Sequence, residues 1–255
     1  MNQNNTSKIL KIISLVPSQT ELLYDLGLES SIVGITKFCI HPYHLKETKM
    51  IVGGTKNINL EKIKRLKPDI ILCNKEENSK EIVDQCKQIT KTHVSEIYDI
   101  QDSIDLIKTY GEFFFCKKEA SKIIAEINFK WTGFKSFIAD KETRKAAYFI
   151  WKNPWMVAAN NTFINYLLEL NNFDNIYKNK ERYPEVEIKK MQLEGNPDLI
   201  FLSSEPYPFT EKHALELEEF IPNATILLVD GEMFSWYGSR LRYAFDYFIA
   251  LQNRL

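Results

Sequence analysis

The sequence lacks the features of several large classes of protein. Neither sign of charge is in excess, because 33 lysines and arginines stand against 34 aspartates and glutamates. A nucleic-acid binder or a membrane-surface binder needs a basic excess, so the balance argues against both. No apolar run reaches the roughly 18 residues that a membrane-spanning helix requires, and we expect no membrane insertion. There is also no low-complexity tract, so we expect disorder only in the first residues, Met1 to Ser7.

Cysteine is scarce and shows no metal-binding or redox spacing. The four cysteines form neither a C-x-x-C motif nor a zinc-ribbon pattern; they are Cys39, Cys73, Cys86 and Cys116. We expect free and mostly buried thiols, which favours a reducing compartment. The N-terminus also lacks the shape of a signal peptide, since its apolar run Ile9 to Val16 is interrupted by Lys11 and leads into Pro17. Either the protein stays in the cytoplasm or a leader is missing from this sequence.

Catalytic and phosphate-binding motifs are missing too. We find no G-x-G-x-x-G, no G-x-x-x-x-G-K-[ST], no G-x-S-x-G and no H-E-x-x-H. Gly53 and Gly54 form a lone pair that predicts a tight turn. His41 and His44 stand three residues apart, as metal ligands can, but Pro42 lies between them and no neighbouring carboxylate completes a site. These absences argue against an enzyme and against an intrinsic cofactor or metal.

Strand and helix patterns alternate along the chain, which predicts an α/β architecture. In the first half, the expected strands are 11–16, 31–36 and 69–73, and the expected helices are 19–25, 60–66 and 79–88. Ser18 and Glu21 have the spacing of a capping box, which predicts how the first of these helices begins.

A long helical pattern separates two similar halves. The segment from Lys117 to about Asp140 keeps apolar residues at helical spacing, and such a helix would be about 36 Å long. After it the earlier pattern returns, with expected strands at 146–151 and 226–229 and expected helices at 162–171 and 239–254. Residues 60–72 and 186–202 also share one order of amphipathic helix, Pro-Asp and apolar strand. We therefore expect two like α/β lobes, 8–115 and 142–255, joined by a linking helix over 116–141.

Several aromatic residues follow predicted strands or precede predicted helices; they are Phe38, Trp155, Tyr183, Tyr207, Phe209, Trp236 and Tyr237. In an α/β lobe these loops gather at the carboxyl ends of the strands, where ligands bind. A cleft lined with aromatic rings suits a large flat or apolar ligand. The alternative for each ring is that it only caps the core beneath its loop.

The segment KIISLVPSQTELLYDLGLESSIVGIT resembles the opening of the helical-backbone (class III) periplasmic substrate-binding proteins of ABC importers, most closely the vitamin B12-binding and ferric-siderophore-binding members. The match continues through NLEKIKRLKPDIIL, NPWMVAANNTFINYLLELNNFDNIY and RYPEVEIKKMQLEGNPDLIFL, and it covers the chain from Lys8 on. The resemblance implies a monomer with two Rossmann-like lobes on one long helix, with the ligand held between the lobes. It also implies a periplasmic location and a ligand that is a cobalamin-type corrinoid, haem or a ferric siderophore.

The resemblance assigns roles to individual positions. In the B12-binding members aromatic side chains clamp the corrin, and Phe38 and Tyr183 match one such position in each lobe. Thr55 stands where those proteins have a further tryptophan, so one wall of that pocket is lost. The family also docks on arginines of the importer permease through one glutamate per lobe. Glu61 matches the first of these, whereas Lys189 stands at the second, with Glu187 two residues earlier.

These observations lead to one main hypothesis and two alternatives. The main hypothesis is a protein that binds a corrinoid or a related large metal chelate and serves import, in which Phe38, Trp155, Tyr183, Tyr207, Trp236 and Tyr237 contact the ligand. The first alternative is a cytoplasmic chelate-handling protein or an enzyme on the same fold, which does not dock on an importer. The second is a direct metal-ion receptor that uses His41 and His44.

Overall fold

The computed structural model of the chain describes residues 9–255, so the expected disorder of Met1 to Ser7 lies outside the described residues. The chain forms two compact units. Unit 1 contains the chain up to Glu96, together with Gln101–Ala125 and Tyr237–Arg240. Unit 2 contains Ile97–Ile100, Glu126–Trp236 and Leu241–Leu255. Each unit is therefore built from segments that are far apart in the sequence.

Unit 1 is built around a five-stranded parallel sheet with the order β3-β2-β1-β4-β5. Its strands are β1 (Ile12–Ser14), β2 (Ile32–Ile35), β3 (Met50–Ile51), β4 (Ile70–Asn74) and β5 (Lys91–Ser95). The central strands β1 and β4 are fully buried, as their continuous apolar sequence requires in a sheet that is covered on both faces.

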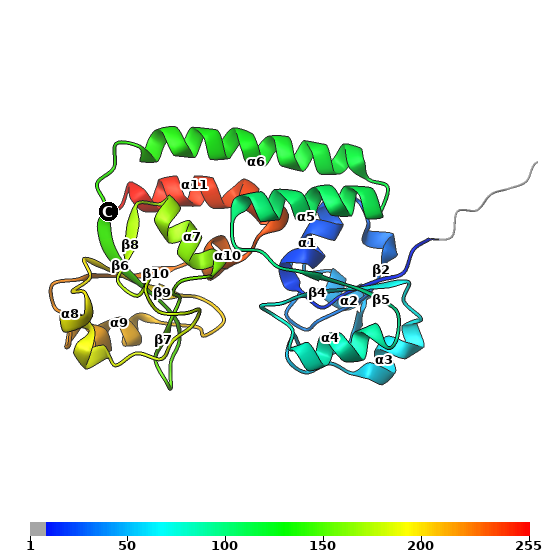
Figure 1. The fold of residues 1–255 in the computed structure, drawn as a ribbon, viewed down its shortest axis with the longest axis horizontal. Coiled ribbons are helices and arrows are strands. Elements are labelled where there is room, and N and C mark those ends of the chain that lie inside the picture. The colour runs from blue at the N-terminus through cyan, green and yellow to red at the C-terminus, as the bar shows by residue number, and fades with distance from the viewer. Residues whose placement is uncertain (1–8) are drawn as a thin grey trace, which may run out of the picture. The chain divides into compact units, whose positions relative to one another are not determined.

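Helices cover both faces of this sheet (Figure 1). They are α1 (Pro17–Asp25), α2 (Leu45–Thr48), α3 (Leu60–Leu66), α4 (Lys80–Lys87) and α5 (Ile100–Phe113), with a short 3₁₀ turn at Glu29–Ser31. Helices α3 and α4 lie on one face, where Ile63 and Val83 pack with Ile13 and Ile71 of the sheet. Helices α1 and α5 lie on the other face.

The start of α1 differs from the sequence prediction. The helix begins at Pro17, which suits the first helical position because its missing N–H would have no partner there. The N-cap is Val16 and no side chain caps the helix. The predicted capping box of Ser18 and Glu21 is therefore wrong, because Glu21 is engaged instead by Arg240.

One long helix connects the two units, as predicted. Helix α6 spans Lys117–Ile138, and the division between the units falls within it, after Ala125. Helix α5 precedes α6 and packs closely against its first turn. A Cβ on Gly111 of α5 would lie only 2.7 Å from the Cβ of Ala120, so this approach requires glycine.

Unit 2 has a mixed five-stranded sheet in which β6 (Arg144–Trp151) is central. The order is β10-β9-β6-β7, and β8 also pairs with β6. Strands β8 (Phe173–Asn175), β9 (Leu199–Ser203) and β10 (Thr225–Val229) run parallel within the sheet, and β7 (Met156–Val157) is antiparallel to β6. Two separate sheets confirm the prediction of two α/β lobes.

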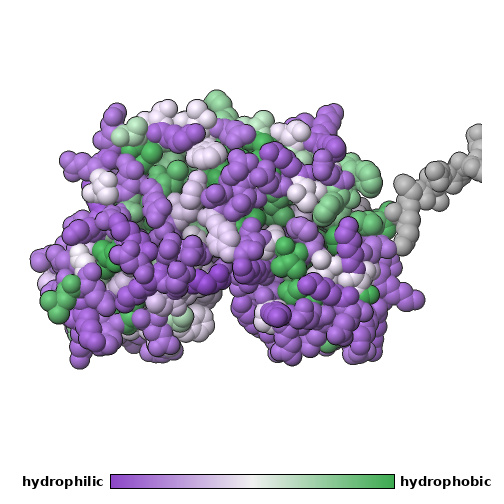
Figure 2. Space-filling view, in the orientation of Figure 1, coloured by the Kyte–Doolittle hydropathy of each residue, from purple (hydrophilic) through white to green (hydrophobic). Residues whose placement is uncertain are grey.

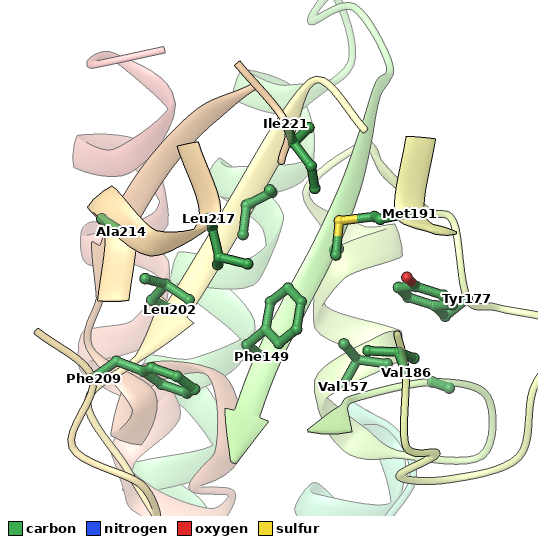
Figure 3. Packing of buried hydrophobic residues seen from close by; sticks show 13 residues of the cluster. Phe149, Val157, Tyr177, Val186, Met191, Leu202, Phe209, Ala214, Leu217 and Ile221 are labelled. Atoms are coloured by element: carbon green, nitrogen blue, oxygen red, sulfur yellow. The ribbon is translucent and has the colours of Figure 1, made fainter. Parts of the chain in front are cut away.

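The helices of unit 2 are α7 (Phe163–Leu170), α8 (Met191–Glu194), α9 (Glu211–Glu218), α10 (Gly231–Ser235) and α11 (Leu241–Gln252). Short 3₁₀ turns stand at Ile188–Lys190 and Gly238–Arg240. One core of the unit is apolar and fully buried, and Figure 3 shows Phe149 at its centre among Leu202, Leu217 and Met191. Alternate residues of the same strands point to the other face, where Tyr148 and Phe201 contact Phe234 of α10.

The surface is mostly hydrophilic on the face that Figure 2 shows. Some large apolar side chains are exposed, for example Phe115 and Phe129, as is common in folded proteins. Within residues 9–255 no helix combines the length and the apolar character that crossing a bilayer would need. All four cysteines are free and buried, as predicted.

Candidate functional site

The strand order of unit 1 identifies the edge at which a ligand can bind. The chain builds β1, β2 and β3 towards one side of the sheet and β4 and β5 towards the other, so the connections reverse direction between β1 and β4. In open α/β sheets the loops at the carboxyl ends of the strands leave a crevice at this point. The relevant segments are 15–18, 36–39, 52–56 and 75–78.

A buried polar network fixes this edge of unit 1. The side-chain amide of Asn74 donates to the backbone oxygen of Ser95 (3.1 Å), and that of Asn78 donates to the oxygen of Thr55 (3.0 Å). Gln19 donates to the hydroxyls of Ser95 (2.6 Å) and Tyr237 (2.8 Å). Because each of these polar groups has a partner, the loops are held in place without the cost of unpaired buried atoms.

The structure therefore places Tyr237 inside unit 1. Its ring is buried, its hydroxyl accepts from Gln19, and burial raises the pKa of the phenol. Tyr110 donates to the carbonyl oxygen of the same glutamine (2.6 Å). Tyr237 thus supports the ligand edge from within rather than presenting a free face.

Glu77 is a candidate site residue that the sequence analysis did not identify. It follows β4, beside the point where the connections reverse. Burial raises its pKa, while the Lys56 cation and a hydrogen bond from the Thr55 side chain oppose that shift. A partly buried carboxyl with a raised pKa at a ligand edge is typical of functional sites.

Phe38 lies at the end of β2 and is 49% exposed. The turn that carries it is rigid, because Phe38 N–H donates to the Thr36 hydroxyl (3.3 Å) and Cys39 N–H donates to the Thr36 carbonyl (3.1 Å). The buried Cys39 thiol lies 3.1 Å from the hydroxyl of Thr20 and anchors the turn from below. An exposed aromatic ring on such a rigid turn can contact a ligand without rearrangement of the backbone.

In unit 2 an aromatic cluster follows the carboxyl ends of β6 and β9. The rings of Trp155 and Phe209 stack at 5.8 Å, Tyr207 lies 4.7 Å from Phe209, and Trp151 lies 5.6 Å from Tyr207. Phe209 is buried beneath the others, whereas Trp151 is 41% exposed. The fold thus brings together two predicted ligand-binding residues, Trp155 and Tyr207.

Polar groups sit directly on this cluster. Lys152 forms an ion pair with Glu216, and its ammonium lies 4.9 Å from the Trp155 ring, as in a cation–π contact. His213 accepts from the Thr210 backbone at Nδ1 (2.9 Å), so the ring proton of the neutral form is on Nε2. Nε2 lies 3.2 Å from the Tyr207 hydroxyl and donates to it, which leaves the hydroxyl hydrogen of Tyr207 free to donate elsewhere.

The other two predicted aromatics lie apart from this cluster. Trp236 is buried, and its indole N–H donates to Glu205 (2.7 Å). Tyr183 is partly buried, and the guanidinium of Arg182 lies 6.0 Å from its ring. Its segment runs beside the β7 region, since Ala159 N–H donates to the Arg182 carbonyl (2.8 Å).

The residues considered for docking are exposed. The side chain of Glu61 on α3 is 74% exposed and pairs with Lys64 (3.0 Å). That of Glu187 is 69% exposed and pairs with Lys190 (2.6 Å). Lys189, which lies between Glu187 and Lys190 in the sequence, is also exposed.

One of the histidines considered for metal binding, His44, has a carboxylate neighbour that the sequence spacing did not reveal. His44 Nε2 lies 2.8 Å from Glu29 Oε1, and the His44 ring packs on Tyr24. Throughout the described part of the chain, however, no group of three or more His, Cys, Asp or Glu residues is placed to hold a metal ion.

Comparison with known proteins agrees with this architecture. The model of the Periplasmic binding protein family matches residues 12–226, which is most of the chain. The chain belongs to this family. It is a family of binding proteins and not of enzymes, as the sequence predicted.

Individual relatives are more distant. The chain is 33% identical over 119 residues to an uncharacterized ABC transporter substrate-binding lipoprotein of Bacillus subtilis, and the match spans 45% of this chain but only 37% of that relative. The fold is similar to that of the periplasmic vitamin B12-binding protein of Vibrio cholerae, with a TM-score of 0.82, 20% identity and 96% of both chains covered. It is also similar to a periplasmic haem-binding protein of Roseiflexus, with a TM-score of 0.83, 14% identity, and 96% and 98% of the two chains covered.

Proposed function

We propose that this protein is the substrate-binding protein of an ABC importer and that its substrate is a large metal chelate: a flat corrinoid or haem, or a ferric siderophore. The observation that carries the proposal is the aromatic cluster of Trp151, Trp155 and Tyr207 at the carboxyl ends of β6 and β9. Aromatic rings that pack on the core with one side and are exposed on the other suit a planar, partly apolar ligand. The family and the relatives that bind vitamin B12 and haem support the same class of ligand.

The polar groups of the cluster add specificity to this apolar surface. The Tyr207 hydroxyl, oriented by His213, supplies a donor for an oxygen or nitrogen of the ligand. Phe38 supplies a second exposed ring at the ligand edge of unit 1. Trp236 and Tyr237, which are buried, act in this proposal by holding the loops in place, and Tyr183 remains a proposed ligand contact.

Ligand titration tests the proposal. We expect cyanocobalamin, dicyanocobinamide, haem or a ferric siderophore to quench the tryptophan fluorescence with an affinity better than about 100 μM. Phe38→Ala should weaken binding by about 1–3 kcal/mol, because an apolar contact area is lost. The control is Phe129→Ala, which removes a more exposed ring from α6 and should leave the affinity unchanged. If no chelate of the panel binds, the proposed function is wrong.

We further propose that Glu61 contributes to docking on the importer permease, whereas the surface around Lys189 opposes it. A cation facing an arginine of the permease would slow association. Glu187 does not replace the missing carboxylate in this proposal, because it stands two positions from Lys189 and pairs with Lys190.

A further inference from the structure

The turn that carries Phe38 also carries a cation. Lys37 directly precedes Phe38, and its ammonium lies 5.0 Å from the centre of the Phe38 ring. Both side chains are exposed. Within residues 9–255 no carboxylate pairs with Lys37, whereas Lys64, Lys75 and Lys152 each form such a pair.

The backbone fixes both residues in this arrangement. Lys37 N–H donates to the carbonyl of Gly53 (2.8 Å), which ties the turn to the segment after β3. Gly54 lies against the turn, since a Cβ there would be 3.1 Å from the Phe38 ring and 3.5 Å from Cε of Lys37. The absence of a side chain at Gly54 therefore lets the ring and the ammonium lie together at the carboxyl edge of the sheet.

We propose that Lys37 and Phe38 form one recognition element for a flat ligand that carries an anionic oxygen group, a carboxylate or a phosphate. Phe38 packs on the planar part of the ligand, and Lys37 forms a charge-assisted hydrogen bond with the anionic oxygen. This inference rests on the proposed function and narrows its substrate class to chelates with a negatively charged substituent. Lys37 has no carboxylate partner among residues 9–255, so no ion pair there has to be broken, and the turn anchored by Cys39 needs little backbone ordering on binding.

Pairs of ligands that differ in their anionic group test the inference. Haem is compared with its dimethyl ester, which lacks the free carboxylates, and cyanocobalamin with dicyanocobinamide, which lacks the phosphate-bearing loop. A ferric siderophore that carries a free carboxylate is compared with the corresponding ester. For the scaffold that binds, we expect the member with the anionic group to bind about tenfold more tightly, and this preference should decrease as salt is added.

Lys37→Met removes the charge and retains most of the side-chain length. It should abolish the preference by weakening only the anionic ligand, while Lys37→Arg should retain it. The matched control is Lys46→Met, because Lys46 is a second lysine of unit 1 whose ammonium lies over an aromatic ring, 5.9 Å from that of Tyr43. This control should leave every affinity unchanged.

The outcomes separate the two proposals. If a chelate binds but the wild-type protein does not distinguish the paired ligands, or Lys37→Met keeps the preference, this inference is wrong and the proposed function stands. If none of the chelates binds, both are wrong.

Discussion

Glu21 and Arg240 form a buried ion pair in unit 1. Arg240 Nε donates to Glu21 Oε2 (2.9 Å), and Nη2 lies 2.7 Å from Oε1, so two guanidinium nitrogens lie close to the two carboxylate oxygens. Burial raises the pKa of Glu21 and the arginine opposes that shift. The ion pair therefore keeps the Glu21 carboxylate charged in a buried position, where an isolated carboxylate would be costly.

Removing one partner of this pair should destabilise the protein strongly. We expect Arg240→Ala to lower the free energy of unfolding by about 3–5 kcal/mol, because Glu21 is left buried without its partner. Urea denaturation measures the change. The double variant Arg240→Met with Glu21→Gln should be much closer to the wild type, and a double variant as unstable as Arg240→Ala would contradict this explanation.

Glu77 should make the stability depend on pH. Its pKa is raised from the ordinary 4.5 by burial, so folding favours the protonated form. The resulting contribution to stability is fully present below the pKa of the unfolded chain and is lost as pH rises through the folded pKa. Glu77→Gln is always neutral and can still accept from Thr55, so it should be more stable than the wild type at pH 8. The difference should disappear by about pH 4, and denaturation midpoints at the two pH values measure it; a variant less stable at pH 8 would contradict the prediction.

At the scale of single residues, the sequence predicted which residues follow the strands better than it predicted which side chains contact one another. The rule that ligand residues follow strands pointed to Phe38, Trp155 and Tyr207, which lie at strand ends in the structure. It could not separate the buried Trp236 from these, because burial depends on what packs over a loop. Lys152 and His213 went unnoticed for the same reason, since their contacts with the aromatic rings arise only when β6, β9 and α9 come together.

Among the helices, α6 offers a controlled test of backbone entropy. Gly133 lies in its interior, and a Cβ added there would meet no atom within 4 Å. We expect Gly133→Ala to stabilise the protein by about 0.5–1 kcal/mol, because alanine loses less backbone freedom on folding.

The matched control is Gly27→Ala at the end of α1. A Cβ there also has open space, but Gly27 has φ +78°, which an alanine adopts with strain. This variant should be destabilised. Thermal unfolding of both variants separates backbone conformation from packing, and equal effects of the same sign would contradict the account.

Elements with strong periodicity were predicted closely from the sequence. The predicted helix 60–66 matches α3, and the predicted helix 117–140 matches α6 to within a few residues. Helix α5 was not identified, and its Gly111 is present because α6 packs against it at close range. The repeated Pro-Asp segment is confirmed, although α8 is shorter than its counterpart α3.

For the whole molecule, surface charge should control the proposed association with an importer permease. Lys189→Glu should increase the rate at which the protein binds a permease that presents arginines, because attraction replaces repulsion. Glu61→Ala should decrease any such binding. Surface-binding kinetics at low and moderate salt measure both effects, with Glu81→Ala on α4 as a control at an exposed position.

A native protein that already binds such a permease tightly, and whose binding is insensitive to Glu61→Ala, would contradict both assignments. The rates should converge at high salt, because exposed charges are then screened.

The segment Tyr237–Arg240 belongs to unit 1, although unit 2 supplies all the residues between it and Ala125. Tyr237 contacts Gln19, Gly238 N–H donates to Ser103 (2.8 Å), and Arg240 binds Glu21. A ribosome therefore releases the N-terminal lobe long before the residues that complete it. Until Tyr237 and Arg240 are synthesised, the buried Gln19 amide of that lobe lacks one of its partners, and the buried Glu21 carboxylate lacks Arg240. A premature stop after Ser235 would damage both halves of the protein, and the cell's proteases should remove the product as a whole.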